Sequence, residues 1–446
     1  MALTGMQIFK LLPKTNCKEC GVPTCLAFAM NLASGKAELD ACPYVSEEAR
    51  AQLEEASAPP IRQVGIGKGV RTAKTGGETV LYRHEKTFYN PTLFAGVIAS
   101  DTPAADVEAK LKIWNAIQFE RVGLNLRPEL AAIKDVNGDK AGFAAVAKLV
   151  AETSEFNVIL MSEDADVMAA GIAACGFKNP LIYAATESNA DAFGKLAADN
   201  GLSLAVKSDS IDGLIALTDK LTAMGLKDLI LDPGSREPKQ ALEDMVGLRR
   251  AALKDSNRSV GFPTIAFPCE MASSLDMEAL IAGTYVAKYG GIVVLSDLTA
   301  EVLFPLLLMR LNVYTDPQRP MVVDEGIYEI GNPDENSPVL VTTNFALTYF
   351  IVSGEVEASK VPTWLLIKDS EGLSVLTAWA AGKFSGDDVG LFVKKSGIMD
   401  KVKHSQLVIP GYAASIVADV EEELPGCTVT VGPREAAHLP GFLKAM

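Results

Sequence analysis

The sequence predicts a multidomain α/β protein made of a small cysteine-rich module, a TIM-like (β/α)₈ barrel and a C-terminal doubly wound α/β domain. Three observations support this. Four of the seven cysteines lie between residues 17 and 42, and short apolar runs alternate with amphipathic stretches from residue 93 onward. A segment rich in proline and turn residues, 314–338, then precedes a second alternating pattern. The length of 446 residues suits roughly three domains of about 150 residues each.

Composition and charge exclude several classes of protein. The 41 basic and 56 acidic residues give a net charge of −15, which argues against a nucleic-acid or anionic-membrane partner. Hydrophobic residues make up 48% of the chain, enough for a large packed core. The best candidate for a membrane span, Val302–Leu311, is too short and contains Arg310. Because no basic region leads to a cleavage site at the N-terminus, we expect a soluble cytoplasmic protein.

The first predicted part, residues 1–57, has the cysteine spacing C-x₂-C-x₄-C-x₁₆-C. Clustered cysteines in a cytoplasmic chain bind metal more often than they form disulfides. Zinc sites usually combine two knuckles, or one knuckle and paired histidines, whereas this segment has one knuckle and no histidine before His84. Four thiolates suit a [4Fe-4S] cluster, and Cys42-Pro43 matches the Cys-Pro ending of bacterial ferredoxin motifs. The predicted cluster ligands are therefore Cys17, Cys20, Cys25 and Cys42, with structural zinc or free thiols as alternatives.

Three short helices are expected around these cysteines. Thr4 is placed to cap a helix through Leu12, Thr24 to cap one through Ala33, and Ser46 precedes a third helix over Glu47–Glu55. A module this small has little core of its own, so a metal centre would contribute much of its stability. The scattered cysteines are interpreted as small buried hydrophobic residues: Cys175, Cys269 and Cys427.

Residues 58–92 are predicted to be a linker, because proline and glycine are frequent there. Within this segment Thr79–Phe88 has a β-rich composition and could dock as a strand. The glycines Gly65, Gly67 and Gly69 resemble a phosphate-binding loop. However, no helix opens directly after them and no GK[ST] follows, so the linker is favoured.

Residues 93–318 contain eight apolar runs separated by amphipathic stretches, the count and length of a (β/α)₈ barrel. The expected strands are Leu93–Ala99, Arg121–Leu126, Asn157–Met161, Leu181–Ala185, Leu202–Val206, Asp228–Leu231, Thr264–Phe267 and Gly291–Leu295. The expected helices include Ala105–Ala116, Phe143–Glu152, Ala165–Ala174, Ala190–Asn200 and Ser210–Met224.

Polar residues follow several of these strands and would lie at the carboxyl-end mouth of the barrel. Helix caps and solvated loops explain them more simply than a catalytic constellation does. They are Ser100-Asp101, Ser162-Glu163-Asp164, Ser208-Asp209, Asp232 with Gly234-Ser235, and Ser296-Asp297.

The last part, residues 319–446, is predicted to form a parallel doubly wound (Rossmann-like) sheet, since two of its β runs are long and apolar. The expected strands are Val339–Thr343, Trp364–Ile367, Gly390–Val393, Leu407–Val408 and Thr428–Val431, and the expected helices are Leu373–Ala381 and Ala413–Glu423.

Open sheets of this class bind ligands at the carboxyl ends of their strands. The segments there carry glycine or small polar residues, as expected where backbone approaches a large polar ligand, although turn chemistry alone gives the same composition. The candidate cofactor-binding residues are Thr342, Thr343, Asn344, Ser370, Gly372, Leu373, Ser374, Gly411, Tyr412, Gly432, Pro433 and Arg434.

Together these features resemble one family over nearly the whole chain. The segments CKECGVPTCLAFAMNLASGKAELDACP and GGETVLYRHEKTFYNP, the barrel and the final domain are similar to the large (gamma) subunit of the corrinoid iron–sulfur protein of the reductive acetyl-CoA pathway. The resemblance implies a methyl carrier rather than a stand-alone enzyme. Its cobamide would take a methyl group from methyltetrahydrofolate, through a separate methyltransferase, and give it to the nickel cluster of acetyl-CoA synthase/CO dehydrogenase. The [4Fe-4S] cluster would re-reduce Co(II) to Co(I).

The resemblance also implies a heterodimer with a small subunit that is itself a barrel, the corrinoid lying between that barrel and the C-terminal domain of this chain. The four clustered cysteines match the cluster ligands of the family one for one. The folate site belongs to the separate enzyme, so Asn125 and Asp232 are not assigned catalytic roles.

The histidines bear on how the cobalt would be held. A corrinoid domain with a histidine ligand has the pattern D-x-H-x-x-G, which none of His84, His404 and His438 matches. We therefore expect a base-off cobamide without an axial ligand from the protein. Two other functions stay open from the sequence: an autonomous barrel enzyme with an accessory cluster, and a flavin-dependent reductase with an iron–sulfur cluster.

Overall fold

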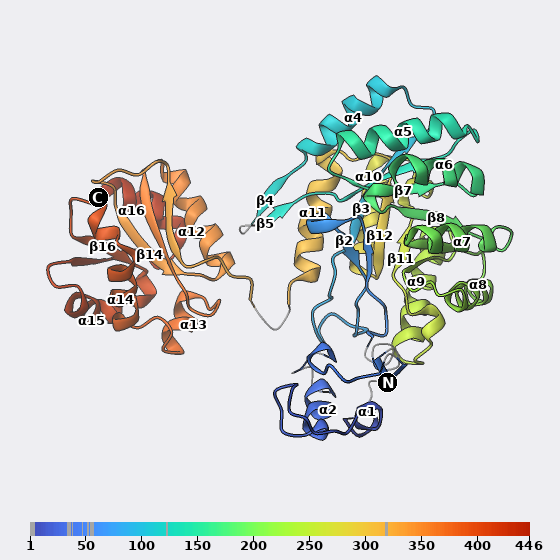
Figure 1. Ribbon diagram of the computed structural model, residues 1–446. Helices are drawn as coiled ribbons and strands as arrows, with labels where there is room; N and C mark the ends of the chain where they lie inside the picture. The colour runs from blue at the N-terminus through green and yellow to red at the C-terminus, as the bar shows by residue number, and fades with distance from the viewer. Residues whose placement is uncertain are drawn as a thin grey trace. The chain divides into compact units, whose positions relative to one another are not determined.

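A computed structural model describes residues 5–33, 37, 39–46, 48–50, 53, 58–121, 124–316 and 320–446. The chain forms two compact units (Figure 1). The first comprises residues 1–118 and 127–314, and the second comprises residues 119–126 and 315–446. In the described part of the chain, no helix is long and apolar enough to cross a bilayer.

The cysteine module contains the helices α1 (Gly5–Leu11) and α2 (Cys25–Ala33) and a 3₁₀ turn, η1 (Leu39–Ala41). The hydroxyl of Thr24 accepts a hydrogen bond of 3.1 Å from the N–H of Ala27, as its predicted role at the start of α2 requires. Thr4 lies outside the described residues, and of the expected third helix only residues 48–50 and 53 are described, all of them helical. The N–H of Ala49 donates to the hydroxyl of Ser46 there.

The predicted barrel is confirmed: eight parallel strands close on themselves, each followed by a helix on the outside (Figure 1). Alternate side chains such as Ala95, Ile159 and Ile292 are buried and fill its interior. The strands are β3 (Leu93–Ala99), β6 (Leu130–Lys134), β7 (Asn157–Met161), β8 (Leu181–Ala185), β9 (Leu204–Lys207), β10 (Leu229–Asp232), β11 (Thr264–Ala266) and β12 (Gly290–Leu295). The helices are α4 (Ala104–Ala116), α5 (Lys140–Thr153), α6 (Ala165–Cys175), α7 (Ala190–Asn200), α8 (Ile211–Ala223), α9 (Pro238–Leu253), α10 (Leu275–Ala287) and α11 (Ala300–Tyr314).

The second barrel strand is not the one expected. Arg121–Leu126 was assigned to the barrel, but β4 (Phe119–Arg121) and β5 (Leu124–Leu126) form a separate antiparallel hairpin that belongs to the second unit. The barrel uses Leu130–Lys134 instead, a run whose first four residues are fully buried. A strand covered on both faces needs such continuous apolar residues, whereas the hairpin exposes Glu120 and Arg121.

The expectation of a linker over residues 58–92 is also wrong in part. Strands β1 (Val64–Ile66) and β2 (Ala73–Thr75) form an antiparallel hairpin whose apolar side chains join the interior core of the barrel. The hydroxyl of Ser203 donates to the carbonyl of Gly65 at 2.9 Å, just before β9 begins. The hairpin therefore closes the amino end of the barrel. Thr79–Phe88, considered as a strand, has no strand structure.

A buried ion pair fixes the rest of this segment. Glu78 and Arg249 of α9 lie 3.0 Å apart, and both side chains are almost fully buried. The guanidinium of Arg249 also lies 4.8 Å from the ring centre of Phe88 and 4.4 Å from that of Tyr289. Aromatic faces stabilise a cation that has lost its water. The segment is thus an integral part of the barrel core.

The second unit contains a five-stranded sheet in the order β13-β15-β14-β16-β17, in which only β13 is antiparallel to its neighbour. Helices α12 and α16 cover one face, and α13, α14 and α15 cover the other (Figure 1). The strands are β13 (Gly326–Ile330), β14 (Val339–Thr343), β15 (Thr363–Lys368), β16 (Gln406–Ile409) and β17 (Thr428–Val431). The helices are α12 (Ala346–Ser359), α13 (Val375–Ala380), α14 (Gly386–Ser396), α15 (Val417–Glu423) and α16 (Leu439–Ala445).

One predicted strand of this unit is wrong. Gly390–Val393 lies inside helix α14. Ser385 caps that helix by accepting a hydrogen bond from the N–H of Asp388, and Gly397 ends it in the left-handed conformation with φ of 70°. The apolar side chains Val389 and Val393 are four residues apart and face the sheet together, as a helix requires.

Candidate functional site

A groove of about 470 Å³ lies at the carboxyl ends of β14, β16 and β17, bordered by α12 and the start of α13. In a parallel sheet these ends are where ligands bind. The groove brings together half of the candidate residues named from the sequence: Thr342, Ser374, Tyr412, Gly432, Pro433 and Arg434.

The groove has apolar walls and a polar rim. Ile351 and Leu376 contribute exposed apolar side chains to its lining. On the rim, the hydroxyl of Tyr412 donates a 3.0 Å hydrogen bond to Glu435, which raises the pKa of the tyrosine and keeps it protonated. The guanidinium of Arg434 lies 6.0 Å from the ring centre of Tyr412. This arrangement suits a large ligand that is apolar on its faces and polar around its edge.

Three other candidate residues shape the loop beside the groove. The side-chain oxygen of Asn344 accepts hydrogen bonds of 3.0 Å from the N–H groups of Ser370 and Gly372. Its amide nitrogen donates to Asp369 at 2.8 Å. Gly372 has φ of +75°, and a Cβ there would lie 2.7 Å from Pro320. None of these three residues lines the groove. They fix the loop that leads to Ser374, which does line it.

The last three candidates also lie outside the lining of the groove. Leu373 packs against the core on the α13 face of the sheet. A Cβ on Gly411 would lie 2.6 Å from the backbone nitrogen of Arg434, so glycine allows two strand-end loops to touch. Thr343 is fully buried at the end of β14, and its hydroxyl has no hydrogen-bond partner among the described residues.

Sequence reasoning missed the wall that α12 supplies. Thr348, Ile351, Val352 and Glu355 line the groove from this helix, which was not predicted. Their spacing of three, one and three residues places them on one helical face, and this periodicity was the available signal. Glu355, which the sequence analysis did not name, adds a carboxylate as a hydrogen-bond acceptor to the α12 wall of the groove.

The four clustered cysteines lie in and around one small apolar core. Cys25 and Cys42 are buried in it with Phe28, Cys20 packs against it, and Cys17 is exposed. Across the described ranges, no three His, Cys, Asp or Glu side chains are arranged as ligands of a metal ion. The donor set nevertheless has the chemistry of an iron–sulfur site, because it offers four thiols next to apolar side chains.

The loop that carries the first two of these cysteines has an unusual backbone. Lys14, Asn16 and Lys18 adopt positive φ values of 60°, 50° and 69°. The side chain of Asn16 accepts a 2.8 Å hydrogen bond from the N–H of Cys25, which ties this loop to the start of α2. The loop is therefore held close to the third cysteine of the cluster motif.

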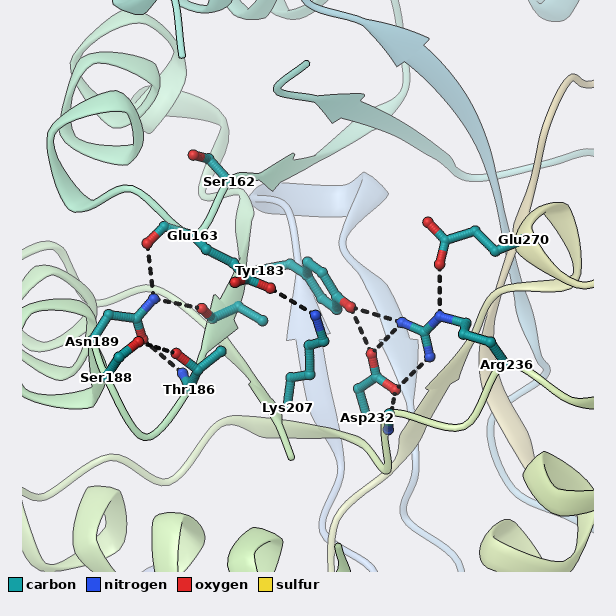
Figure 2. A network of polar contacts seen from close by, with 12 residues as sticks. Ser162, Glu163, Tyr183, Thr186, Ser188, Asn189, Lys207, Asp232, Arg236 and Glu270 are labelled. Atoms are coloured by element: carbon teal, nitrogen blue, oxygen red, sulfur yellow. Dashed lines mark hydrogen bonds and ion pairs between the residues drawn. The ribbon is translucent and has the colours of Figure 1, made fainter. Parts of the chain in front are cut away.

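The mouth of the barrel holds a polar network that is buried at Tyr183 and Asp232 and partly exposed elsewhere (Figure 2). The hydroxyl of Tyr183 donates to Asp232 at 2.6 Å, and Arg236 contacts the same carboxylate at 2.9 Å. Arg236 also pairs with Glu270 at 2.6 Å, which in turn pairs with Lys134 at 2.8 Å. Burial, followed by the charge of Asp232, raises the pKa of Tyr183 well above its ordinary value, so this hydroxyl remains a donor.

Asp164, one of the polar residues expected at this mouth, caps a helix, as predicted. Asp164 accepts hydrogen bonds from the N–H groups of Asp166 and Val167 at the start of α6, and Ser210 does the same for Gly213 at the start of α8. Lys207 is paired with Glu163 at 2.7 Å. The charged groups in Figure 2 are thus engaged with one another. This arrangement is typical of a structural network rather than of an acid–base pair.

The fold and the groove define a class of protein in which a four-cysteine module, a (β/α)₈ barrel and an α/β unit with a groove at its strand ends share one chain. The family described as CO dehydrogenase/acetyl-CoA synthase delta subunit matches residues 63–443, and a family described as putative Fe-S cluster matches residues 12–44. The chain belongs to the family of corrinoid/iron–sulfur protein large subunits and acetyl-CoA decarbonylase/synthase gamma subunits, which confirms the resemblance in its sequence.

Three relatives illustrate this membership. The corrinoid/iron-sulfur protein large subunit of Moorella thermoacetica is 46% identical over 445 residues, covering 100% of this chain and 99% of the relative. The acetyl-CoA decarbonylase/synthase complex subunit gamma of Methanopyrus kandleri is 36% identical, and the alignment covers 99% of this chain and 97% of the relative. The subunit gamma of Methanothermobacter thermautotrophicus is 33% identical, and the alignment covers 100% of this chain and 99% of the relative.

Proposed function

We propose that this chain is a methyl carrier that binds a corrinoid in the groove at the strand ends of its second unit. The observation that carries the proposal is the convergence of Thr342, Ser374, Tyr412 and Arg434 on that groove. A cobamide bound there would supply a cobalt centre able to take a methyl group from methyltetrahydrofolate, through a separate methyltransferase, and to give it to the nickel–iron–sulfur cluster of acetyl-CoA synthase. The names of the relatives support this role.

The groove residues perform three tasks in this proposal. Ile351 and Leu376 cover apolar parts of the ligand, and Gly432 lets the ligand approach the strand end closely because it has no side chain. Tyr412, Glu435 and Arg434 offer donors and acceptors to polar groups at the ligand's edge. The walls also keep water away from the ligand's buried face.

No histidine is among the residues that line the groove, so none is assigned to the cobalt in this proposal. The ring of His404 hydrogen-bonds the carbonyl of Ser337 at 2.9 Å, and both residues precede strands, at the opposite end of the sheet from the groove. Ser374, at the start of α13, lines the groove and offers no nitrogen donor. The cobamide is therefore expected to be base-off and without an axial ligand from the protein, which favours the Co(I) state.

The cysteine module delivers electrons in this proposal. A [4Fe-4S] cluster held by Cys17, Cys20, Cys25 and Cys42 would supply the single electron that returns Co(II) to Co(I). The apolar side chains around Cys25 and Cys42 limit solvent access, which helps to set a low potential. The chain acts with a small subunit as a heterodimer, and with the methyltransferase and acetyl-CoA synthase as successive partners.

The test is metal analysis and a visible spectrum of the complex with its small subunit, purified without oxygen. We expect cobalt and iron in the wild type, with a corrinoid spectrum rather than a flavin spectrum. Ile351→Asp places a charge in the apolar wall of the groove and should lower the cobalt bound per chain at least about tenfold. Leu391→Asp, on an exposed position of α14 outside the groove, is the matched control and should retain cobalt. Equal cobalt in both variants would contradict the placement.

A further inference from the structure

The four cysteines of the cluster motif lie on three separate pieces of chain. Cys17 and Cys20 lie on the loop after α1, Cys25 is the first residue of α2, and Cys42 directly follows η1. Cys25 and Cys42 are buried, whereas Cys17 is exposed and Cys20 is half-buried. Apolar packing alone therefore does not fix the first loop against the other two pieces.

The hydroxyl of Tyr44 joins the last of these pieces to the first. It donates a 2.8 Å hydrogen bond to the carboxylate of Glu19, a residue that lies between Cys17 and Cys20. Tyr44 itself follows Cys42 by two residues. A hydrogen bond to a carboxylate is about twice as strong as one between neutral groups. This bond thus holds the segment of the fourth cysteine against the loop of the first two, although both side chains are exposed.

The side chain of Asn16 joins the middle piece to the first. Its oxygen accepts a 2.8 Å hydrogen bond from the N–H of Cys25, one of the N–H groups that a helix leaves without an internal partner at its start. Asn16 has φ of 50°, a conformation that asparagine adopts more readily than most residues. Because Cys17 is the next residue, this bond ties the first cysteine of the motif to the third.

We propose that Asn16, Glu19 and Tyr44 are positioning residues, which hold the three pieces of chain so that all four thiols can reach one metal centre. We name these three residues the cysteine clamp. The proposal rests on the proposed function for the identity of that centre. The clamp residues are not ligands: they act through the backbone segments that carry the thiols. Ligands that are held in place before the metal centre assembles bind it more tightly, because less freedom is lost on binding.

The test uses the full chain co-produced with its small subunit and purified without oxygen, and measures how fast a chelator removes iron. Tyr44→Phe keeps the ring but removes the donor, and Asn16→Gly keeps the positive φ but removes the acceptor. Each should lose iron at least about fivefold faster than the wild type. Glu19→Gln and Asn16→Asp are the matched conservative variants. Each keeps a side-chain oxygen that accepts the same hydrogen bond, so both should lose iron at the wild-type rate.

A second measurement separates positioning from general stability of the module. In Tyr44→Phe the thiols are held less firmly, so the g values of the reduced cluster should shift in electron paramagnetic resonance. The midpoint potential should rise as water gains access to the cluster. Tyr328→Phe removes a 3.0 Å hydrogen bond to the carbonyl of Asp324 in the second unit and is the control for loss of a tyrosine hydroxyl. It should match the wild type in iron loss, g values and potential.

Three results would overturn the proposal. Tyr44→Phe and Asn16→Gly could lose iron at the wild-type rate. They could lose iron faster while g values and potential stay unchanged, which would make the clamp a stabilising contact only. Glu19→Gln could lose iron as fast as Tyr44→Phe, which would assign the effect to the charge of the carboxylate.

The proposed function is tested separately in the same preparations. Zinc in place of iron in the wild type would contradict the [4Fe-4S] assignment. The order of metal-loss rates among the variants would then still show whether the clamp positions the thiols.

Discussion

The side chain of Asn344 holds Ser370 in place: its oxygen accepts 3.0 Å hydrogen bonds from both the N–H and the hydroxyl of that residue. The side-chain amide of Asn344, at the end of β14, therefore holds the loop from Asp369 to Ser374 in place. This arrangement explains why asparagine stands at a position that does not itself line the groove.

We predict that Asn344→Ala loosens this loop. The N–H groups of Ser370 and Gly372 would lose their shared acceptor, at a cost of about 1–3 kcal/mol for each buried donor, whereas the hydroxyl of Ser370 keeps the carbonyl of Leu373 as its acceptor at 2.9 Å. Amide hydrogen exchange over residues 369–374 should become faster, and corrinoid retention should fall with it. Asn200→Ala, at the exposed end of α7, is the control and should leave exchange in this loop unchanged.

A second prediction concerns the cysteine module. Cys20→Ala should lower the iron content of the anaerobic protein and abolish reductive reactivation, because one of four cluster ligands is removed. A carrier that is already methylated should still donate its methyl group. Cys427→Ala, which removes a cysteine of the second unit, should leave the iron content at the wild-type level. One equivalent of zinc with no iron in the wild type would contradict the assignment of an iron–sulfur cluster.

A third prediction concerns the lower face of the cobalt. Electron paramagnetic resonance of the Co(II) form should show no triplet splitting, since no histidine is among the residues that line the groove. His438 is the nearest histidine in sequence to the groove, following the lining residues Ala436 and Ala437. Triplets that disappear in His438→Ala or His404→Ala would mean that a histidine binds the cobalt.

A fourth prediction concerns the buried ion pair between Glu78 and Arg249. Glu78→Ala leaves the guanidinium of Arg249 buried without its counter-charge, which typically costs about 3–5 kcal/mol. The melting temperature of the barrel should fall, as followed by near-ultraviolet circular dichroism. The double variant Glu78→Leu with Arg249→Met removes both charges and should recover much of that loss. A single variant as stable as the wild type would mean that residues 58–92 do not brace the barrel.

The sequence predicted long apolar strands best. Val339–Thr343 and Thr428–Val431 match β14 and β17 to the residue, because β-branched runs bounded by turns have few other solutions. The predicted strand Gly390–Val393 is wrong because a run of four apolar residues fits a short strand and a buried stretch of helix equally well. The capping signals on either side, Ser385 and Gly397, were the information that distinguishes the two.

The position of the groove could be predicted from the sequence, but not which side chains line it. Strand-end logic led to the segments that border the groove, since the carboxyl ends of parallel strands meet at one edge. It could not separate Ser374, which lines the groove, from Ser370, which holds the loop, because both are serines in the same turn. Likewise, residues 58–92 contain the glycines of a linker, and only tertiary packing places Val64 and Ile66 in the barrel core.

The hairpin of β4 and β5 has a consequence for how the chain can be made and cut. Residues 118 and 127 belong to the first unit and residues 119–126 to the second, where the guanidinium of Arg121 lies 4.0 Å from the ring centre of Phe350 on α12. During synthesis the ribosome releases this hairpin well before its helical partner exists, so the second unit cannot finish folding as an independent C-terminal block. A protease cut near residue 316 would likewise leave the two halves joined through the hairpin's contacts. Any separately expressed second unit must therefore carry residues 119–126 with it, by circular permutation or as an added peptide.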